Sequence, residues 1–149
     1  MHISARVTAD ERGELAAWLS PEQRRLFAAM HRADRRHGLD VVARLRADGW
    51  TDEDVLLAGL FHDAGKGRTG LWPRVAWSLG ERYGRLPQIV AGMVPGMRRA
   101  LAVLDTHPES SARLAQAAGC SERTAALIRD QAHPADDAGR ALRRADEAS

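Results

Sequence analysis

Apolar residues recur at helical spacing along most of the chain, and no stretch alternates between apolar and polar positions as a strand would. The pattern predicts helices over about residues 9–19, 52–61, 110–118, 122–131 and 138–148, with two more between Pro21 and Gly49. Turn signals recur at helical intervals between these segments. We therefore expect an all-α fold of about seven to nine helices in one domain, residues 1–149.

Capping signals mark where the first two helices begin. Thr8 and Glu11 have the spacing of a capping box, and Ser20 is followed by proline at the first helical position and by Gln23 three residues later. The helix that begins at Pro21 is predicted to continue along one apolar stripe. This stripe consists of Leu26, Phe27, Met30 and Ala33.

The helix predicted at 52–61 is the most apolar in the chain. Thr51 is its predicted cap, and acidic residues fill its first turn, where the helix dipole favours them. The rest is almost wholly apolar, as expected of a buried central helix. It ends in the adjacent pair His62 and Asp63, which glycines follow at two nearby positions. Imidazole and carboxylate both coordinate metals, so the pattern indicates a helix that stops and delivers both groups to one point.

Composition narrows the class of protein. The chain has 149 residues, of which 44% are hydrophobic, enough for one domain with its own core. Its 22 basic and 20 acidic residues are spread evenly, which does not favour nucleic-acid binding. Cys120 is a single cysteine and allows no intramolecular disulfide. With no apolar run of about 20 residues and no signal-peptide pattern, we expect a soluble cytoplasmic protein.

The residues His62-Asp63-Ala64-Gly65-Lys66 resemble the motif of the HD superfamily of metal-dependent phosphohydrolases, close to its His-Asp-Ile-Gly-Lys variant. Members of that family carry a lone upstream His, a His-Asp doublet and a distant Asp. His37 occupies the upstream place, near the start of a predicted helix, and the run that ends in Asp146 matches the closing Leu-x-x-Ala-Asp. The resemblance covers about Leu26 to Asp146 and implies a single HD-type domain. Its parts are 1–19 (lead-in and short helix), 20–66 (upstream ligand and His-Asp helices), 67–104 (a variable helical segment) and 105–149 (hairpin and last ligand helix).

The resemblance also implies the chemistry. His37, His62, Asp63 and Asp146 would bind a divalent metal ion, and Mn, Fe, Co, Ni, Zn and Mg all suit such a mixed nitrogen and oxygen set. Asp63 would also orient the attacking water. Three cationic side chains would contact the substrate phosphate, Lys66, Arg74 and Arg144, with Lys66 also stabilising the transition state. The expected reaction is hydrolysis of a phosphate ester, monoester or diester, of a nucleotide or related small metabolite.

Two His-Pro pairs bracket the predicted helical hairpin at 110–131. They begin with His107 and His133, and members of the family with more than one metal place extra histidines in this way. We therefore expect His107 and His133 to bind a second metal ion or to orient water and substrate. The Gly-Tyr-Pro sequence of members that cleave cyclic dinucleotides is absent after His133. This absence argues against a cyclic di-GMP phosphodiesterase.

Other functions stay open from the sequence. Residues 110–131 also resemble a DNA-binding helix-turn-helix, but the second helix offers few basic side chains, and acidic residues offset them. An HD-type domain that binds a nucleotide as a sensor, without turnover, is a further alternative. Residues 67–104 are expected to form two or three short helices that pack in the core. A lid over the site or a homo-oligomer surface is the alternative for that segment.

Overall fold

The computed structural model describes residues 6–66 and 107–149, and these form seven α-helices and one short 3-10 helix with no strand. The all-α prediction is confirmed, while the helices expected within 67–104 lie outside the described residues. No helix in the described ranges is long and apolar enough to cross a membrane. The elements are α1 (Ala9–Trp18), α2 (Pro21–Ala29), α3 (Arg32–Ala47), α4 (Glu53–Phe61), η1 (Ala64–Lys66), α8 (His107–Ala117), α9 (Glu122–Arg129) and α10 (Asp137–Glu147).

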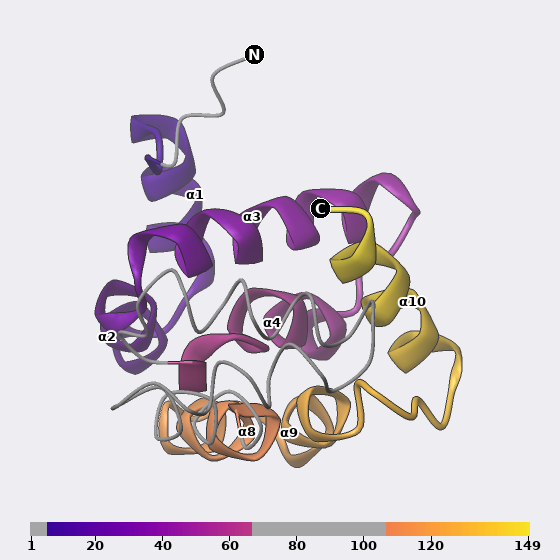
Figure 1. Ribbon diagram of the computed structural model, residues 1–149. Coiled ribbons are helices and arrows are strands. Elements are labelled where there is room, and N and C mark those ends of the chain that lie inside the picture. Colours follow the sequence, from indigo (N-terminus) through magenta and orange to yellow (C-terminus); the bar gives the residue numbers. More distant parts are fainter. Residues whose placement is uncertain (1–5, 67–106) are drawn as a thin grey trace, which may run out of the picture.

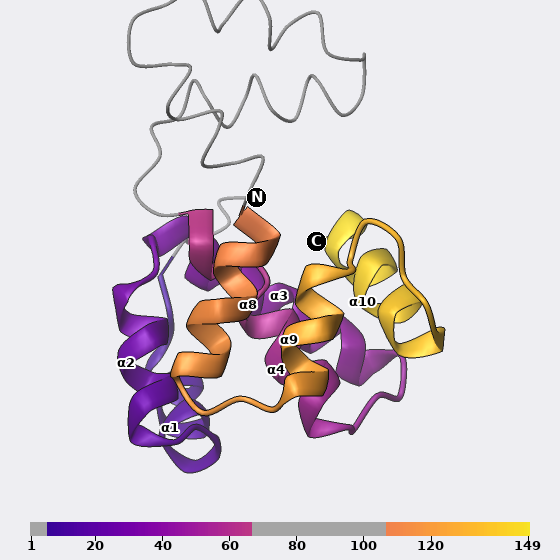
Figure 2. The same cartoon turned by 90° about the horizontal axis from the view of Figure 1, so that it is seen from below.

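Helix α4 is the centre of the fold. Every residue from Val55 to Phe61 is buried, and a helix that is apolar all round needs neighbours on all sides. In Figure 1, α3 runs along one side of α4, α8 and α9 lie on the other, and α10 closes one end. Figure 2 shows α8 and α9 side by side across this central helix. Because α4 is buried, His62 and Asp63, which follow its last residue, also lie in the interior.

Small residues let α3 and α4 approach closely. A Cβ atom added at Gly38 of α3 would lie 2.5 Å from the backbone oxygen of Leu60, too close for any side chain there. On the facing helix, a Cβ added at Gly59 would lie 2.8 Å from Leu45 Cδ1. This close packing puts His37 of α3 beside the end of α4.

The helix beginning at Pro21 is shorter than its apolar stripe predicts. It was expected to continue through Ala33, but it ends at Ala29 with Met30 in an extended conformation. The physical reason is a new N-cap, because His31 Nδ1 accepts a hydrogen bond of 3.2 Å from the backbone N–H of Ala33. Helix α3 therefore starts early, and His37 lies in its second turn.

The predicted capping signals have a mixed outcome. Both capping boxes form, with the side chains of Thr8 and Ser20 accepting hydrogen bonds from the backbone N–H three residues later. The predicted cap of α4 was wrong by one residue. Asp52, not Thr51, occupies that position, and its carboxylate accepts a hydrogen bond of 3.0 Å from the N–H of Asp54.

Candidate metal centre

Three side chains from helices far apart in the sequence converge beside the end of α4. His37 comes from α3, His62 follows α4, and Asp146 lies in the last turn of α10. One nitrogen or oxygen atom from each lies within 4.8 Å of the other two. His37 Nε2 is 2.7 Å and His62 Nε2 is 3.2 Å from the same atom, Asp146 Oδ1. This arrangement could hold one metal ion.

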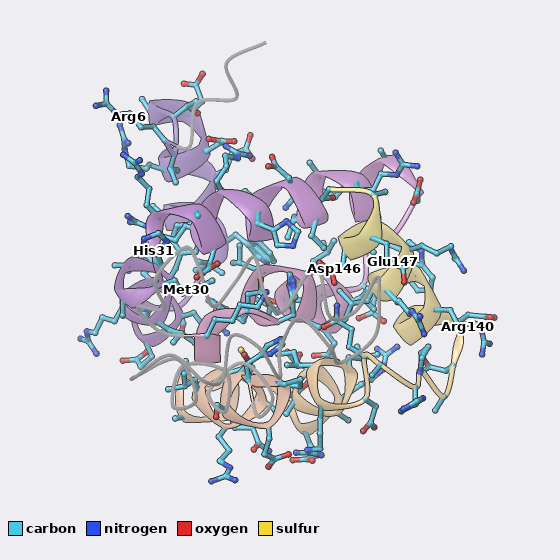
Figure 3. All side chains as sticks on the ribbon, viewed as in Figure 1. Arg6, Met30, His31, Arg140, Asp146 and Glu147 are labelled. Carbon is cyan, nitrogen blue, oxygen red and sulfur yellow. The ribbon has the colours of Figure 1, made fainter. Side chains whose placement is uncertain are left out.

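The centre has a buried side and a more open side. The His62 side chain is 2% exposed, whereas those of His37 and Asp146 are 28% and 30% exposed. Figure 3 shows Asp146 on α10, facing the region between α3 and α4. An ion held here would therefore have one face directed away from the core, where water and a substrate could bind.

The backbone of α4 fixes the orientation of the His62 ring. His62 Nδ1 lies 2.9 Å from the carbonyl oxygen of Gly59, and a carbonyl can only accept, so Nδ1 carries the proton and donates it. Nε2 then points toward Asp146 but makes no well-aligned hydrogen bond, although the atom is buried. Histidines that bind metals typically donate one ring N–H to a carbonyl or carboxylate, which leaves the other nitrogen for the ion, and the Nδ1 contact of His62 has this form.

Asp63 adds a second carboxylate beside His37, His62 and Asp146. Its side chain is 3% exposed, and its Oδ2 pairs with Lys66 Nζ at 2.6 Å. Its Oδ1 lies 3.5 Å from His62 Nε2 and 3.6 Å from His107 Nε2, and it is buried without a hydrogen-bond partner. A buried carboxylate oxygen is costly without a donor or cation. Asp63 Oδ1 and His62 Nε2, both buried without a hydrogen bond, therefore fit a cation between them and their neighbours.

Gln131 completes the environment of Asp146, and no sequence motif pointed to it. Its Nε2 donates a hydrogen bond of 2.7 Å to Asp146 Oδ2, the oxygen that does not face the histidines. Gln131 lies just beyond α9, two residues before His133. The segment after α9 thus reaches the centre, but through an amide and not through the predicted histidine.

Charges around the centre shift the pKa values of its groups. Burial disfavours a charge on His62, but the negative charges of Asp63 and Asp146 outweigh it and raise the pKa of His62 to about 9. Burial likewise opposes ionisation of Asp63 and Asp146, yet the neighbouring cationic groups hold both carboxyl pKa values below their usual range. The proton on His62 thus supplies positive charge beside both carboxylates. A metal ion would displace that proton on binding.

His107 lies beside Asp63 of the His-Asp pair. It begins α8, its side chain is 13% exposed, and it faces Asp63 Oδ1. Helix α8 is held against η1, because the N–H of Gly65 donates a hydrogen bond of 2.8 Å to Ser111 Oγ. A Cβ added at Gly65 would lie 2.6 Å from the backbone nitrogen of Ser111, which shows how close this contact is. His107 thus lies near the His-Asp pair, and its role as a ligand or water-orienting group stays a prediction.

Two further predicted residues, His133 and Arg144, make no described contact with the centre. His133 is exposed, and its ring makes no hydrogen bond or ion pair with the described residues. Arg144 is also exposed on α10, where its charge acts on Asp137. It precedes Asp146 by two residues, which places the two side chains on different faces of the helix. Arg74 lies outside the described residues.

The hairpin of α8 and α9 has the chemistry of a packed core element. In α9, Thr124 and Ile128 are buried, and Thr124 Oγ1 bonds to Asp54 Oδ1 at 3.0 Å. Its two arginines are paired within the protein, since Arg123 contacts Asp52 at 2.6 Å and Arg129 contacts Glu109 at 3.1 Å. A recognition helix needs basic side chains directed at DNA. These contacts do not favour the helix-turn-helix alternative.

Comparison of the chain with protein-family models, curated proteins and solved structures found no match. Function is therefore inferred from the site itself.

Proposed function

We propose that this chain is a metal-dependent phosphohydrolase of the HD type. The observation that carries the proposal is the convergence of His37, His62 and Asp146, whose donor atoms lie within 4.8 Å of one another. The order of these residues and the adjacent Asp63 match the metal-binding pattern that the sequence resembles. The proposed substrate is a phosphate ester of a nucleotide or a related small metabolite.

The side chains present fit a divalent ion. Two imidazoles and one carboxylate, with the Asp63 carboxylate beside them, form a mixed set that suits Mn, Fe, Co, Ni, Zn or Mg. The buried atoms His62 Nε2 and Asp63 Oδ1, which make no hydrogen bond, support a cation at this place more directly than the resemblance does. When bound, such an ion lowers the pKa of a water molecule and offsets charge on phosphoryl oxygens.

The protein groups have separate roles in this proposal. Asp63 would orient the attacking water and accept its proton, because Oδ1 faces the centre while Lys66 holds Oδ2. Lys66 places its ammonium group beside Asp63, and its side chain is 22% exposed. It would donate to a phosphoryl oxygen as negative charge develops there. Gln131 would hold the Asp146 carboxylate through Oδ2 and leave Oδ1 to the ion.

His107 supports a more specific version of the site. Asp63 Oδ1 lies at nearly equal distances from His62 and His107, so one carboxylate oxygen could serve two neighbouring positions. We propose one ion at His37, His62 and Asp146, with His107 either orienting water or binding a second ion. Metal stoichiometry of a His107→Ala variant separates the two roles. A second-ion role requires the loss of one ion, and a water-orienting role requires unchanged stoichiometry with lower activity.

The experiment that tests the function is a hydrolysis assay with each candidate metal against phosphate monoesters, phosphodiesters and nucleotides. Asp63→Asn should lower turnover by about a hundredfold or more, because general-base contributions are of that order. The matched control is Asp130→Asn, an exposed aspartate at the end of α9. Circular dichroism checks that both variants are folded.

Two outcomes of this assay would contradict the proposal. Equal hydrolysis by the wild type and Asp63→Asn would exclude Asp63 from the reaction. Metal-dependent binding of a nucleotide without any turnover would instead show that the chain is a sensor.

A further inference from the structure

A second concave site lies on another side of α3. It is a cavity of about 460 Å³ between the N-terminal segment, α1, α2 and the first turns of α3, within the range of about 300–1,000 Å³ typical of small-ligand sites. Arg35 lines it, and a helix rotates about 200° over the two residues from Arg35 to His37. In Figure 3, Arg6 at this cavity lies at the upper left end of the molecule, whereas Asp146 of the metal centre lies near the middle of the view, beside α10.

The lining of the cavity combines an apolar floor with arginines. Leu15, Leu19 and Phe27 form the buried part of the floor. The polar lining consists of the arginines Arg6, Arg12, Arg24, Arg32 and Arg35, with no acidic residue, hydroxyl, amide or imidazole among the lining side chains. The whole chain has a formal net charge of +2, so this is a local concentration of positive charge. The cavity therefore offers apolar contact and cationic donors.

Arg35 marks where an anion would bind. Its Nε is buried without a hydrogen-bond partner, and the guanidinium forms no ion pair with the described residues. The next residue, Arg36, shows the contrast, because it pairs with Glu11 at 2.7 Å and Asp40 at 2.6 Å. A partly buried charge without a partner is unfavourable, and an anionic ligand would remove that cost.

We propose that this cavity binds a monomeric single-chain anionic amphiphile. The alkyl chain would lie on Leu15, Leu19 and Phe27, and a carboxylate or phosphate head would accept hydrogen bonds from Arg35 and Arg32. A nucleobase fits less well, because its amino groups need acceptors. Arginine only donates, and no lining side chain is an acceptor. This site is independent of the metal-dependent reaction.

The test is isothermal titration of the full-length protein with decanoate below its micelle concentration. Decanoate should bind with one molecule per chain, and 1-decanol, which has the same chain without the charge, should bind at least about tenfold more weakly. Decyl phosphate should bind as decanoate does. Inorganic phosphate and adenosine monophosphate should bind at least about tenfold more weakly than decanoate, because neither places an alkyl chain on the apolar floor.

Variants locate the site. Arg35→Gln should weaken decanoate binding at least about tenfold while leaving the melting temperature unchanged or higher, since an unpaired charge is removed. A merely structural arginine would lower the melting temperature instead. Arg32→Gln provides a second test at the same cavity. Arg25→Gln is the matched control, because Arg25 is 77% exposed on α2, pairs with Glu22 and does not line the cavity.

Four results would overturn the proposal. The first is that decanoate does not bind, and the second is that decanoate and 1-decanol bind with equal affinity. The third is that Arg25→Gln and Arg35→Gln weaken decanoate binding equally. The fourth is that adenosine monophosphate binds as tightly as decanoate and depends on Arg35 in the same way. The last result would assign the cavity to nucleotides.

Discussion

Gln131 and Asp146 are joined by a hydrogen bond of 2.7 Å from the amide Nε2 to the carboxylate Oδ2. The other carboxylate oxygen, Oδ1, lies 2.7 Å from His37 Nε2 and faces the candidate metal position. Asp146 lies in the last turn of α10, where helices tend to fray. Gln131 therefore holds the carboxylate in place and leaves one oxygen directed at the histidines.

Replacing Gln131 with alanine should weaken metal binding about tenfold, because groups that orient a ligand contribute about 10–100-fold to metal affinity. Competition with a chromophoric chelator measures this affinity. Gln116→Ala is the matched control, since the Gln116 amide also donates to a carboxylate, that of Glu122, outside the centre. Equal affinities in both variants would show that Gln131 does not position Asp146.

Lys66→Met should lower turnover while metal content stays unchanged, because the ammonium is assigned to the substrate phosphate and not to the ion. Lys66→Arg should restore little, since the guanidinium fork is larger and differently shaped than an ammonium. Steady-state kinetics and metal analysis of the same samples check both statements. Unchanged kinetics would show that Lys66 takes no part in the reaction, and loss of metal would show that Lys66 acts through its ion pair with Asp63.

Gly38→Ala should destabilise the fold by roughly 1–3 kcal/mol, the usual range for overpacking, because its Cβ would collide with the backbone of Leu60. Urea denaturation measures the free energy of unfolding. Gly13→Ala in α1 is the control, since no atom outside its own helical turn lies within 4 Å of the added Cβ. That change should stabilise by up to about 1 kcal/mol. Similar effects at both glycines would contradict the close approach of α3 and α4.

The Glu11–Arg36 ion pair should make stability depend on pH in the acid range. Burial opposes ionisation of Glu11, but hydrogen bonds from Thr8 and Arg36 outweigh it and lower its pKa from the ordinary value of 4.5. A lowered folded-state pKa stabilises the protein above the unfolded-state value and loses this effect as pH falls through the folded-state value.

Glu11→Gln isolates this contribution. Glutamine keeps the acceptor of the capping box, as Gln23 does in α2, but removes the charge. The variant should melt below the wild type at pH 7, and the difference should shrink below about pH 4.5. Glu14→Gln, at a 73% exposed side chain, should show little difference at either pH. A difference between Glu11→Gln and the wild type that is constant with pH would rule out the ion pair as its cause.

The features that the sequence predicted correctly depend on residues a few positions apart along the chain. Capping at Thr8 and Ser20 and the apolar run of α4 are local patterns, and the structure has them where they were expected. The break at Met30 was missed because an apolar stripe continues across it. His31 caps a new helix there through its own side chain, a contact that apolar periodicity does not indicate.

Part of the candidate metal centre could also be predicted from the sequence. A shared site was predicted for His37, His62, Asp63 and Asp146, and the structure brings donor atoms of His37, His62 and Asp146 within 4.8 Å of one another, with Asp63 beside them. The approach of Gln131 could not be predicted, because it depends on how the turn after α9 is directed in space. His133 was expected at the centre from its His-Pro setting at the end of the hairpin and from the family resemblance. The hairpin returns the chain to that end of the molecule, but the imidazole lies exposed, and its role as a ligand stays an unsupported prediction.

The most direct test of the central claim is the metal content of purified protein after chelator treatment, reloading with a divalent ion and removal of excess ion. The wild type should retain at least one ion per chain. His37→Ala and Asp146→Ala should each lose the ion held at their shared point, while His133→Ala, which changes an exposed imidazole, should retain the wild-type content. A wild type that retains no ion, or His37→Ala and Asp146→Ala variants with wild-type metal content, would contradict the assignment of these side chains as a metal centre.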